Sequence, residues 1–171
     1  MRKTTIAKLS LMAGAMMAIS FAGAQTNGPQ GYSVRLGLFM PSNNLASELG
    51  HTWFGLGVDY KLNSMQTTSP SKGDQAYFGI SADYYSHGSN SDIPVAFTYN
   101  LRQGQMVWSA GLGPDFRNSG DLTSTGIGLG EQIGVAYEFG NTATPFFVAA
   151  KYFFSSKPEL SGLGIFIGAR F

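Results

Sequence analysis

The sequence predicts an all-β protein, an eight-stranded antiparallel up-and-down β-barrel that spans a membrane. Apolar residues alternate with small or polar residues along eight segments, the period of a strand that has one apolar face. Charged residues make up 12% of the chain and aromatic residues 13%, whereas a soluble domain carries about a quarter charged residues. The last alternating segment, 162–171, ends on the aromatic Phe171 with no polar tail. A surface this poor in charge is typical of a protein that faces lipid.

Residues 1–24 have the features of a secretory signal peptide. Arg2, Lys3 and Lys8 precede an uncharged stretch, which ends at the small residues 22–24. That stretch is shorter than the ~20 residues that a transmembrane helix needs. We therefore expect a signal peptide over 1–24 and one barrel domain over 25–171.

The strand pattern recurs at regular intervals after the polar lead. The expected strands cover residues 32–40, 52–62, 76–84, 93–102, 106–116, 133–139, 145–154 and 162–171. Ten residues at ~3.3 Å each, tilted by ~40°, rise about 25 Å, the height of the apolar band of outer-membrane barrels. A soluble sandwich or lipocalin-like barrel also alternates, but its second face is rich in Lys, Glu and Thr rather than in glycine and aromatic residues.

Two positions disturb the pattern. Pro114 cannot donate to a strand ladder, so we expect the fifth strand to end or bulge there. Extending the sixth strand backward with unchanged parity would point Glu131 at lipid. A bulge near Gly130, or a position above the membrane, would avoid this.

The chain resembles the small eight-stranded outer-membrane barrels of bacteria, the OmpX type and the membrane domain of the OmpA type. The resemblance covers residues 32–171 and depends on strand count, parity and Phe171. In that family a terminal aromatic residue is read by the outer-membrane assembly machinery, so Phe171 is the expected assembly signal. A glycine and a second aromatic usually precede it, but Phe166 and Ala169 occupy those positions here. The resemblance implies a location in the bacterial outer membrane and contacts with membrane lipid and lipopolysaccharide.

Composition excludes several other classes of protein. Three of the eleven Lys and Arg lie in the signal peptide, which leaves eight basic against ten acidic residues and no basic stripe for nucleic acid. There is no cysteine, so disulfides and thiolate metal sites are excluded. We find no metal-ligand spacing and no nucleotide-binding motif, so we expect neither a metal nor a cofactor. We also expect the protein to be a monomer.

The inward side of the strands carries two groups of residues that define the expected lumen. Six charges are expected at one level near the periplasmic end, where they pair as a plug or, with their positive excess, select anions in a narrow pore. They are Arg35, Asp59, Lys61, Arg102, Glu138 and Arg170. Five inward aromatic side chains either fill the outer half of the lumen or line a slot for one acyl chain. They are Phe39, Trp53, Tyr85, Phe153 and Phe166.

A possible catalytic motif lies in the predicted loop after the third strand. His87 and Ser89 are two residues apart, a spacing that suits a base and a nucleophile, and Asp92 follows. The stretch resembles the His-x-Ser-Asn motif of outer-membrane lipid A deacylases, but that family has it on a later strand with a glutamate nearby. A polar surface loop explains the same residues. The sequence thus favours a non-enzymatic barrel for envelope integrity or surface interaction, with a lipid-modifying hydrolase or a narrow pore as alternatives.

Overall fold

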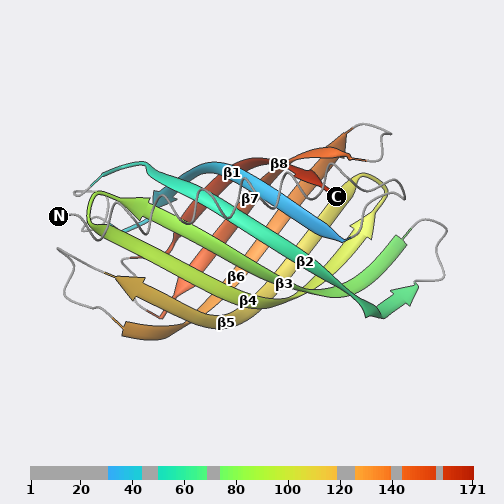
Figure 1. The fold of residues 1–171 in the computed structure, drawn as a ribbon, viewed down its shortest axis with the longest axis horizontal. Helices are drawn as coiled ribbons and strands as arrows, with labels where there is room; N and C mark the ends of the chain where they lie inside the picture. The colour runs from blue at the N-terminus through green and yellow to red at the C-terminus, as the bar shows by residue number, and fades with distance from the viewer. Residues whose placement is uncertain (1–30, 44–49, 69–73, 119–125, 140–143, 157–159) are drawn as a thin grey trace.

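The chain forms a closed barrel of eight antiparallel strands in sequence order (Figure 1). The structure is a computed structural model that describes residues 31–43, 50–68, 74–118, 126–139, 144–156 and 160–171. The strands are β1 (Tyr32–Pro41), β2 (Trp53–Thr68), β3 (Asp74–His87), β4 (Asn90–Gln103), β5 (Met106–Asn118), β6 (Gly126–Phe139), β7 (Phe146–Ser155) and β8 (Gly162–Arg170). The predicted fold class is confirmed, while the expected signal peptide lies outside the described residues.

Both ends of the described chain lie at the same end of the barrel. The backbone of Tyr32 and that of Phe171 exchange two hydrogen bonds, with N···O distances of 3.1 and 2.7 Å. We call this end, where β4, β6 and β8 finish, the terminal rim, and the opposite end the distal rim. An even number of strands requires this arrangement in an up-and-down barrel.

Several strands are longer than the alternation predicts. Residues 86–92, expected to be a loop, instead continue β3 and β4 to a two-residue turn at Gly88 and Ser89, where Gly88 has a φ of 59°. At the terminal rim β2 and β3 extend beyond the other strands, with a register irregularity between Leu62 and Thr67 (Figure 1). Polar residues can continue a strand beyond the apolar band because backbone pairing does not depend on side-chain polarity.

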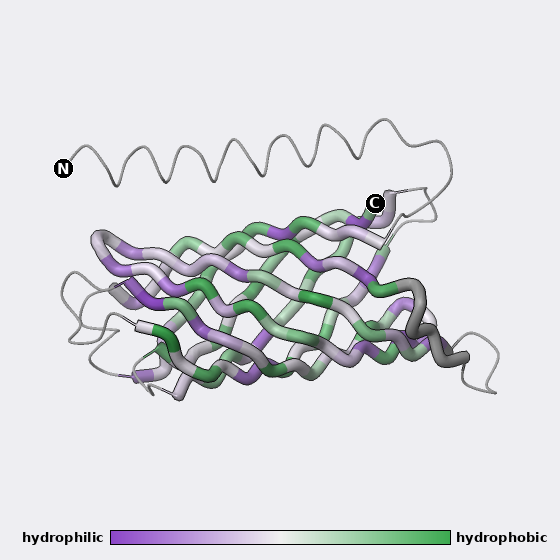
Figure 2. Tube along the Cα trace, turned by 60° about the horizontal axis from the view of Figure 1, so that its bottom comes forward, coloured by the Kyte–Doolittle hydropathy of each residue, from purple (hydrophilic) through white to green (hydrophobic). Residues whose placement is uncertain are grey.

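The predicted orientation of the side chains is confirmed. Large apolar residues at alternate positions are exposed on the outside, among them Leu36 at 52%, Leu112 at 61% and Ile167 at 58%. The residues between them face the lumen. Figure 2 shows this alternation as hydrophobic segments between pale and hydrophilic ones along each strand. Among the described residues there is no helix both long and apolar enough to cross a membrane.

Neither of the two expected bulges is present, and β5 does not end at Pro114. β5 continues through Pro114 to Asn118, and the register of β4 with β5 is the same on both sides of it. The missing N–H of a proline interrupts the ladder locally but does not force a shift. The β5–β6 register also runs through Gly130 without a bulge, so Glu131 is exposed on the outer face, opposite Leu112 and Phe154. The other alternative, a position above the membrane, stays a prediction.

Candidate functional site

A buried charge cluster lies near the middle of the lumen. Arg35 forms ion pairs with Asp59 and Asp83, and its Nη2 is 2.6 Å from Oδ1 of Asp83. Nζ of Lys151 is 2.6 Å from Oδ2 of the same carboxylate. Ser81 Oγ accepts hydrogen bonds from both cations, at 3.0 and 3.1 Å. We call these five residues the central cluster. Its two cations and two anions balance, which is the condition for burying charge in a narrow space.

A second cluster lies at the terminal rim. Glu138 forms ion pairs with two arginines. Its Oε2 is 2.5 Å from Nη2 of Arg102, and its Oε1 is 2.9 Å from Nη1 of Arg170. Arg170 also lies 3.3 Å from the hydroxyl of Tyr77, and Nζ of Lys61 is 4.9 Å from the centre of the Tyr77 ring. In this cluster of described residues, three cations thus lie around one carboxylate, an excess of positive charge.

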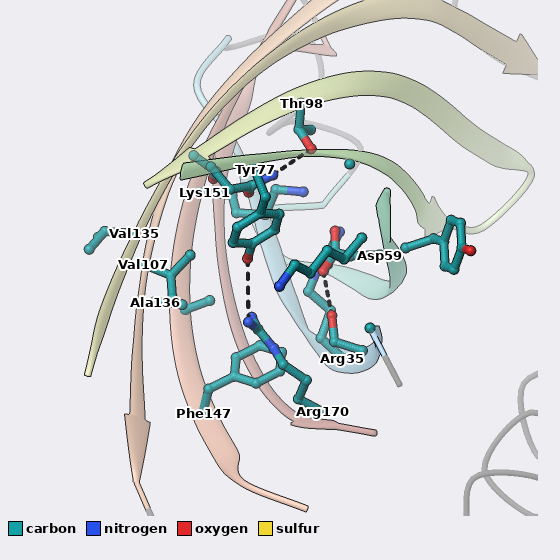
Figure 3. Close-up of a pocket in the computed structure, with 18 of the residues that line it drawn as sticks. Arg35, Asp59, Tyr77, Thr98, Val107, Val135, Ala136, Phe147, Lys151 and Arg170 are labelled. Atoms are coloured by element: carbon teal, nitrogen blue, oxygen red, sulfur yellow. Dashed lines mark hydrogen bonds and ion pairs between the residues drawn. The ribbon is translucent and has the colours of Figure 1, made fainter. Parts of the chain in front are cut away.

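A cavity of about 70 Å³, lined by both charged and apolar residues, lies between the two clusters (Figure 3). Arg35, Asp59 and Lys151 line it on the side of the central cluster, and Tyr77 and Arg170 on the side of the rim. A cavity needs about 10–15 Å³ of such volume to hold one water, so this cavity has room for a few waters. Ligand pockets usually enclose ~300–1,000 Å³, so this cavity is too small for an organic substrate.

Aromatic rings fill the lumen on the distal side of the central cluster. Phe39 stacks on Tyr85 at 4.2 Å between ring centroids, and Tyr85 lies 6.1 Å from Phe153. No ring of the group is more than 2% exposed. The members are Phe39, Trp53, Tyr85, Phe153 and Phe166, which we call the aromatic plug. The expected filling of the lumen by these rings is confirmed.

A third set of charges lies beyond the plug, towards the distal rim. Oδ2 of Asp115 is 3.1 Å from Nε of Arg117 and 2.7 Å from Oγ of Ser155. Asp92 is 1% exposed, and its carboxylate accepts no hydrogen bond from the described residues. The described part of the chain holds no group of three or more His, Asp or Glu placed to bind a metal ion.

The six charges predicted to share one level fall into two groups instead. Arg35 and Asp59 belong to the central cluster, and the other four lie at the terminal rim. Because the strands are tilted and staggered, residues at the same distance from their strand ends lie at different heights along the barrel axis. Counting residues from the strand ends therefore misplaces the charges. For the same reason sequence reasoning missed Asp83 and Lys151, although parity already pointed both inward.

The possible catalytic pair lies at the distal rim. His87 packs its imidazole on Trp53, with ring centroids 6.2 Å apart, and Ser89 is exposed in the turn. The nearest acid along the chain, Asp92, makes no hydrogen bond to His87. Among the described residues, Asp92 therefore does not orient the imidazole as the acid of a catalytic triad would.

Phe171, the expected assembly signal, follows the last residue of β8. Its backbone closes the barrel against Tyr32, and its side chain is half-buried. The aromatic group is therefore accessible at the terminal rim. Whether the assembly machinery reads it stays a prediction.

Comparison with known proteins finds similarity in fold rather than in sequence. The chain matches no protein-family model and no curated protein. Among solved structures, the outer membrane enzyme PagL matches with a TM-score of 0.50 and 14% identity, over 80% of this chain and 97% of that one. The Yersinia pestis outer membrane protein Ail matches at 12% identity and a TM-score of 0.47, over 84% and 97%. The chain thus shares the small eight-stranded barrel fold with PagL, while the OmpX-type or OmpA-type assignment stays a prediction.

Proposed function

We propose that this protein is a non-enzymatic bacterial outer-membrane β-barrel with a closed lumen, which contributes to envelope integrity or surface interaction. The observation that carries the proposal is the aromatic plug. Its five rings are at most 2% exposed and close the lumen next to the central cluster. A protein without an open path acts through its surfaces rather than by transport.

The outer face supports a location in a membrane. Aromatic side chains are exposed at both ends of the barrel, Tyr32, Trp108 and Tyr137 towards the terminal rim and Phe116 and Phe154 towards the distal rim. Aromatic girdles flank the apolar band of outer-membrane barrels in this way. Membrane lipid and lipopolysaccharide are accordingly the expected partners, and the assembly machinery is the expected partner of the nascent barrel.

The geometry of the described residues around His87 and Ser89 favours a non-enzymatic role over the hydrolase. The cavity in the lumen is too small for a substrate, and Asp92 does not reach His87. Turnover of lipid A or phospholipid by the purified protein, compared with Ser89→Ala, tests this directly. Equal absence of activity in both proteins is the expected result, and turnover that Ser89→Ala removes would favour the hydrolase.

Conductance tests the closed lumen. In planar bilayers we expect negligible steady conductance from the wild-type protein. The double variant Phe39→Ala/Tyr85→Ala, which removes the stacked rings, should show leaky openings. Arg35→Ala should leak less, because the plug remains. A stable, anion-selective channel in the wild type would instead assign a pore function to the positive excess at the terminal rim.

A further inference from the structure

Glu131 is a carboxylate on the outer face of the barrel. It is the sixth of the fourteen residues of β6, in the half towards the distal rim. Its neighbours on the same face of the strand, Leu129 and Ile133, are both 53% exposed, and Leu112 and Phe154 lie opposite on the flanking strands. No other charged side chain whose burial the structure describes points outward from the strands. Placing an ionisable group on a lipid-facing surface costs free energy, so a residue of this kind is a candidate functional site.

Among the described residues the carboxylate has no partner. No hydrogen bond or ion pair from the described residues reaches it, because every described Lys and Arg of the strands points into the lumen. The charge of Glu131 is therefore available to a group outside the protein.

An apolar groove of about 500 Å³ begins next to Glu131. Ile133, which lines the groove, is the next outward residue of β6, ~6.6 Å along the strand. The groove exists because the outward positions Ala110 and Ala150 are small, while Trp108 and Tyr152 rise beside them.

The wall at the Glu131 end of the groove is held in place. The hydroxyl of Tyr152 lies 2.9 Å from Oγ of Ser42, and the Tyr152 ring packs 4.5 Å from that of Phe154, the cross-strand neighbour of Glu131. A preformed wall lowers the entropy that a ligand would lose on binding.

We propose that the groove and Glu131 form a binding site for one membrane amphiphile, with an acyl chain in the groove and a protonated amine of the head group on the carboxylate. The volume lies within the range of ligand sites, and the lining is apolar apart from a few polar groups. An ammonium group supplies the opposite charge and hydrogen bonds that a carboxylate near lipid requires. This inference depends on the membrane location in the proposed function.

The charges favour this occupant over others. A second copy of the barrel would bring no outward cation from its described strands, so a dimer across this face would leave Glu131 unpaired. A divalent cation needs several oxygen ligands, and no second acid lies beside Glu131 on β6 or on its neighbours β5 and β7. An anionic head group would be repelled.

Trp108 makes the site measurable, because it lines the groove while the only other tryptophan, Trp53, lies in the plug. The full-length protein is reconstituted in nanodiscs of zwitterionic phospholipid. A long-chain primary alkylamine brominated along its chain is added, and Trp fluorescence is recorded. The chain-matched brominated alcohol serves as the neutral probe. Trp108→Phe identifies the signal.

We expect the amine to quench Trp108 saturably at about tenfold lower mole fraction than the alcohol, the scale of one charge-assisted hydrogen bond. Glu131→Gln should abolish the difference between the two probes, and Glu131→Asp should restore part of it. Ala150→Phe, which fills the groove, should remove saturable quenching by both. Equal quenching by amine and alcohol in the wild type, or an unchanged preference in Glu131→Gln, would overturn the proposal. Either result leaves the conductance test of the closed lumen unaffected.

Discussion

At the scale of single residues, the acid that joins the lumen charges is Asp83. One oxygen of its carboxylate contacts Arg35 and the other contacts Lys151, and the side chain is 1% exposed. Asp59 also pairs with Arg35, but its side chain is 39% exposed and borders the cavity. Water can replace a lost partner at Asp59 more easily than at Asp83.

Asp83→Asn should therefore destabilise the barrel more than Asp59→Asn. We expect a loss of ~3–5 kcal/mol for Asp83→Asn, because Arg35 and Lys151, whose side chains are only 2% and 8% exposed, both lose a carboxylate partner. For Asp59→Asn we expect about 1 kcal/mol, since solvent screens that pair. Urea unfolding in phospholipid vesicles measures both. Equal losses would show that water reaches the whole cluster.

Gly37 is required where β1 meets β8. A Cβ atom there would collide with the carbonyl oxygen of Ile165 and lie 2.8 Å from Cα of Phe166. Gly37→Ala should cost about 1–3 kcal/mol, the usual range for overpacking, because backbone must move. Gly134→Ala is the control, since its added methyl first meets Oγ of Ser109, a side-chain atom that can rotate away. The same unfolding titration compares the two, and a larger loss for Gly134→Ala would contradict the assignment.

At the scale of the strand, the outer face of β1 should report its depth in the membrane. Leu36 lies in the middle of β1 and Met40 lies next to its distal end, both on the outside. Leu36→Arg should cost about 2–4 kcal/mol and Met40→Arg about 0–1 kcal/mol, because the penalty for a cation falls from the midplane to the interface. Unfolding in vesicles measures both. Equal penalties would mean that β1 does not cross an apolar layer.

Two changes at Phe171, which follows β8, should distinguish an effect on assembly from an effect on stability. Phe171→Ala keeps the two backbone hydrogen bonds to Tyr32 and removes only the ring. We expect less folded protein in the outer membrane, while protein refolded in detergent keeps its heat resistance on a gel. Unchanged membrane levels would show that the ring is not an assembly signal. Deletion of Phe171 should lower stability as well, because the backbone pairing is lost.

At the scale of the whole molecule, both ends of the described chain lie at one rim, so one experiment fixes orientation. We expect the terminal rim in the periplasm, the usual arrangement of barrels with an even strand number. An epitope inserted between Gly88 and Ser89, at the distal rim, should bind antibody on intact cells. The same epitope between Gly104 and Gln105, in the other two-residue turn, should bind only after the outer membrane is opened. The reverse labelling would invert the barrel.

Strand number and the apolar outer face follow from local pattern. A strand places alternate side chains on opposite faces whatever its neighbours do, so Leu36, Leu112 and Ile167 could be assigned to the outside from their order alone. The same rule pointed the plug aromatics inward. The third and fourth strands were predicted too short. The prediction ended them where the apolar alternation stops, but the polar residues 86–92 pair through their backbone as apolar ones do.

The charges that meet in the lumen depend on the closed barrel. Asp83 and Lys151 are 68 residues apart in sequence, and their approach depends on the tilt and stagger summed over every strand between them. No local window contains that sum. The position of Glu131 at the end of an apolar groove has the same origin, because β4, β5, β6, β7 and β8 all contribute to the groove. The alternation of side chains is set within one strand, whereas the height of a side chain along the barrel axis depends on the tilt and stagger of all eight strands.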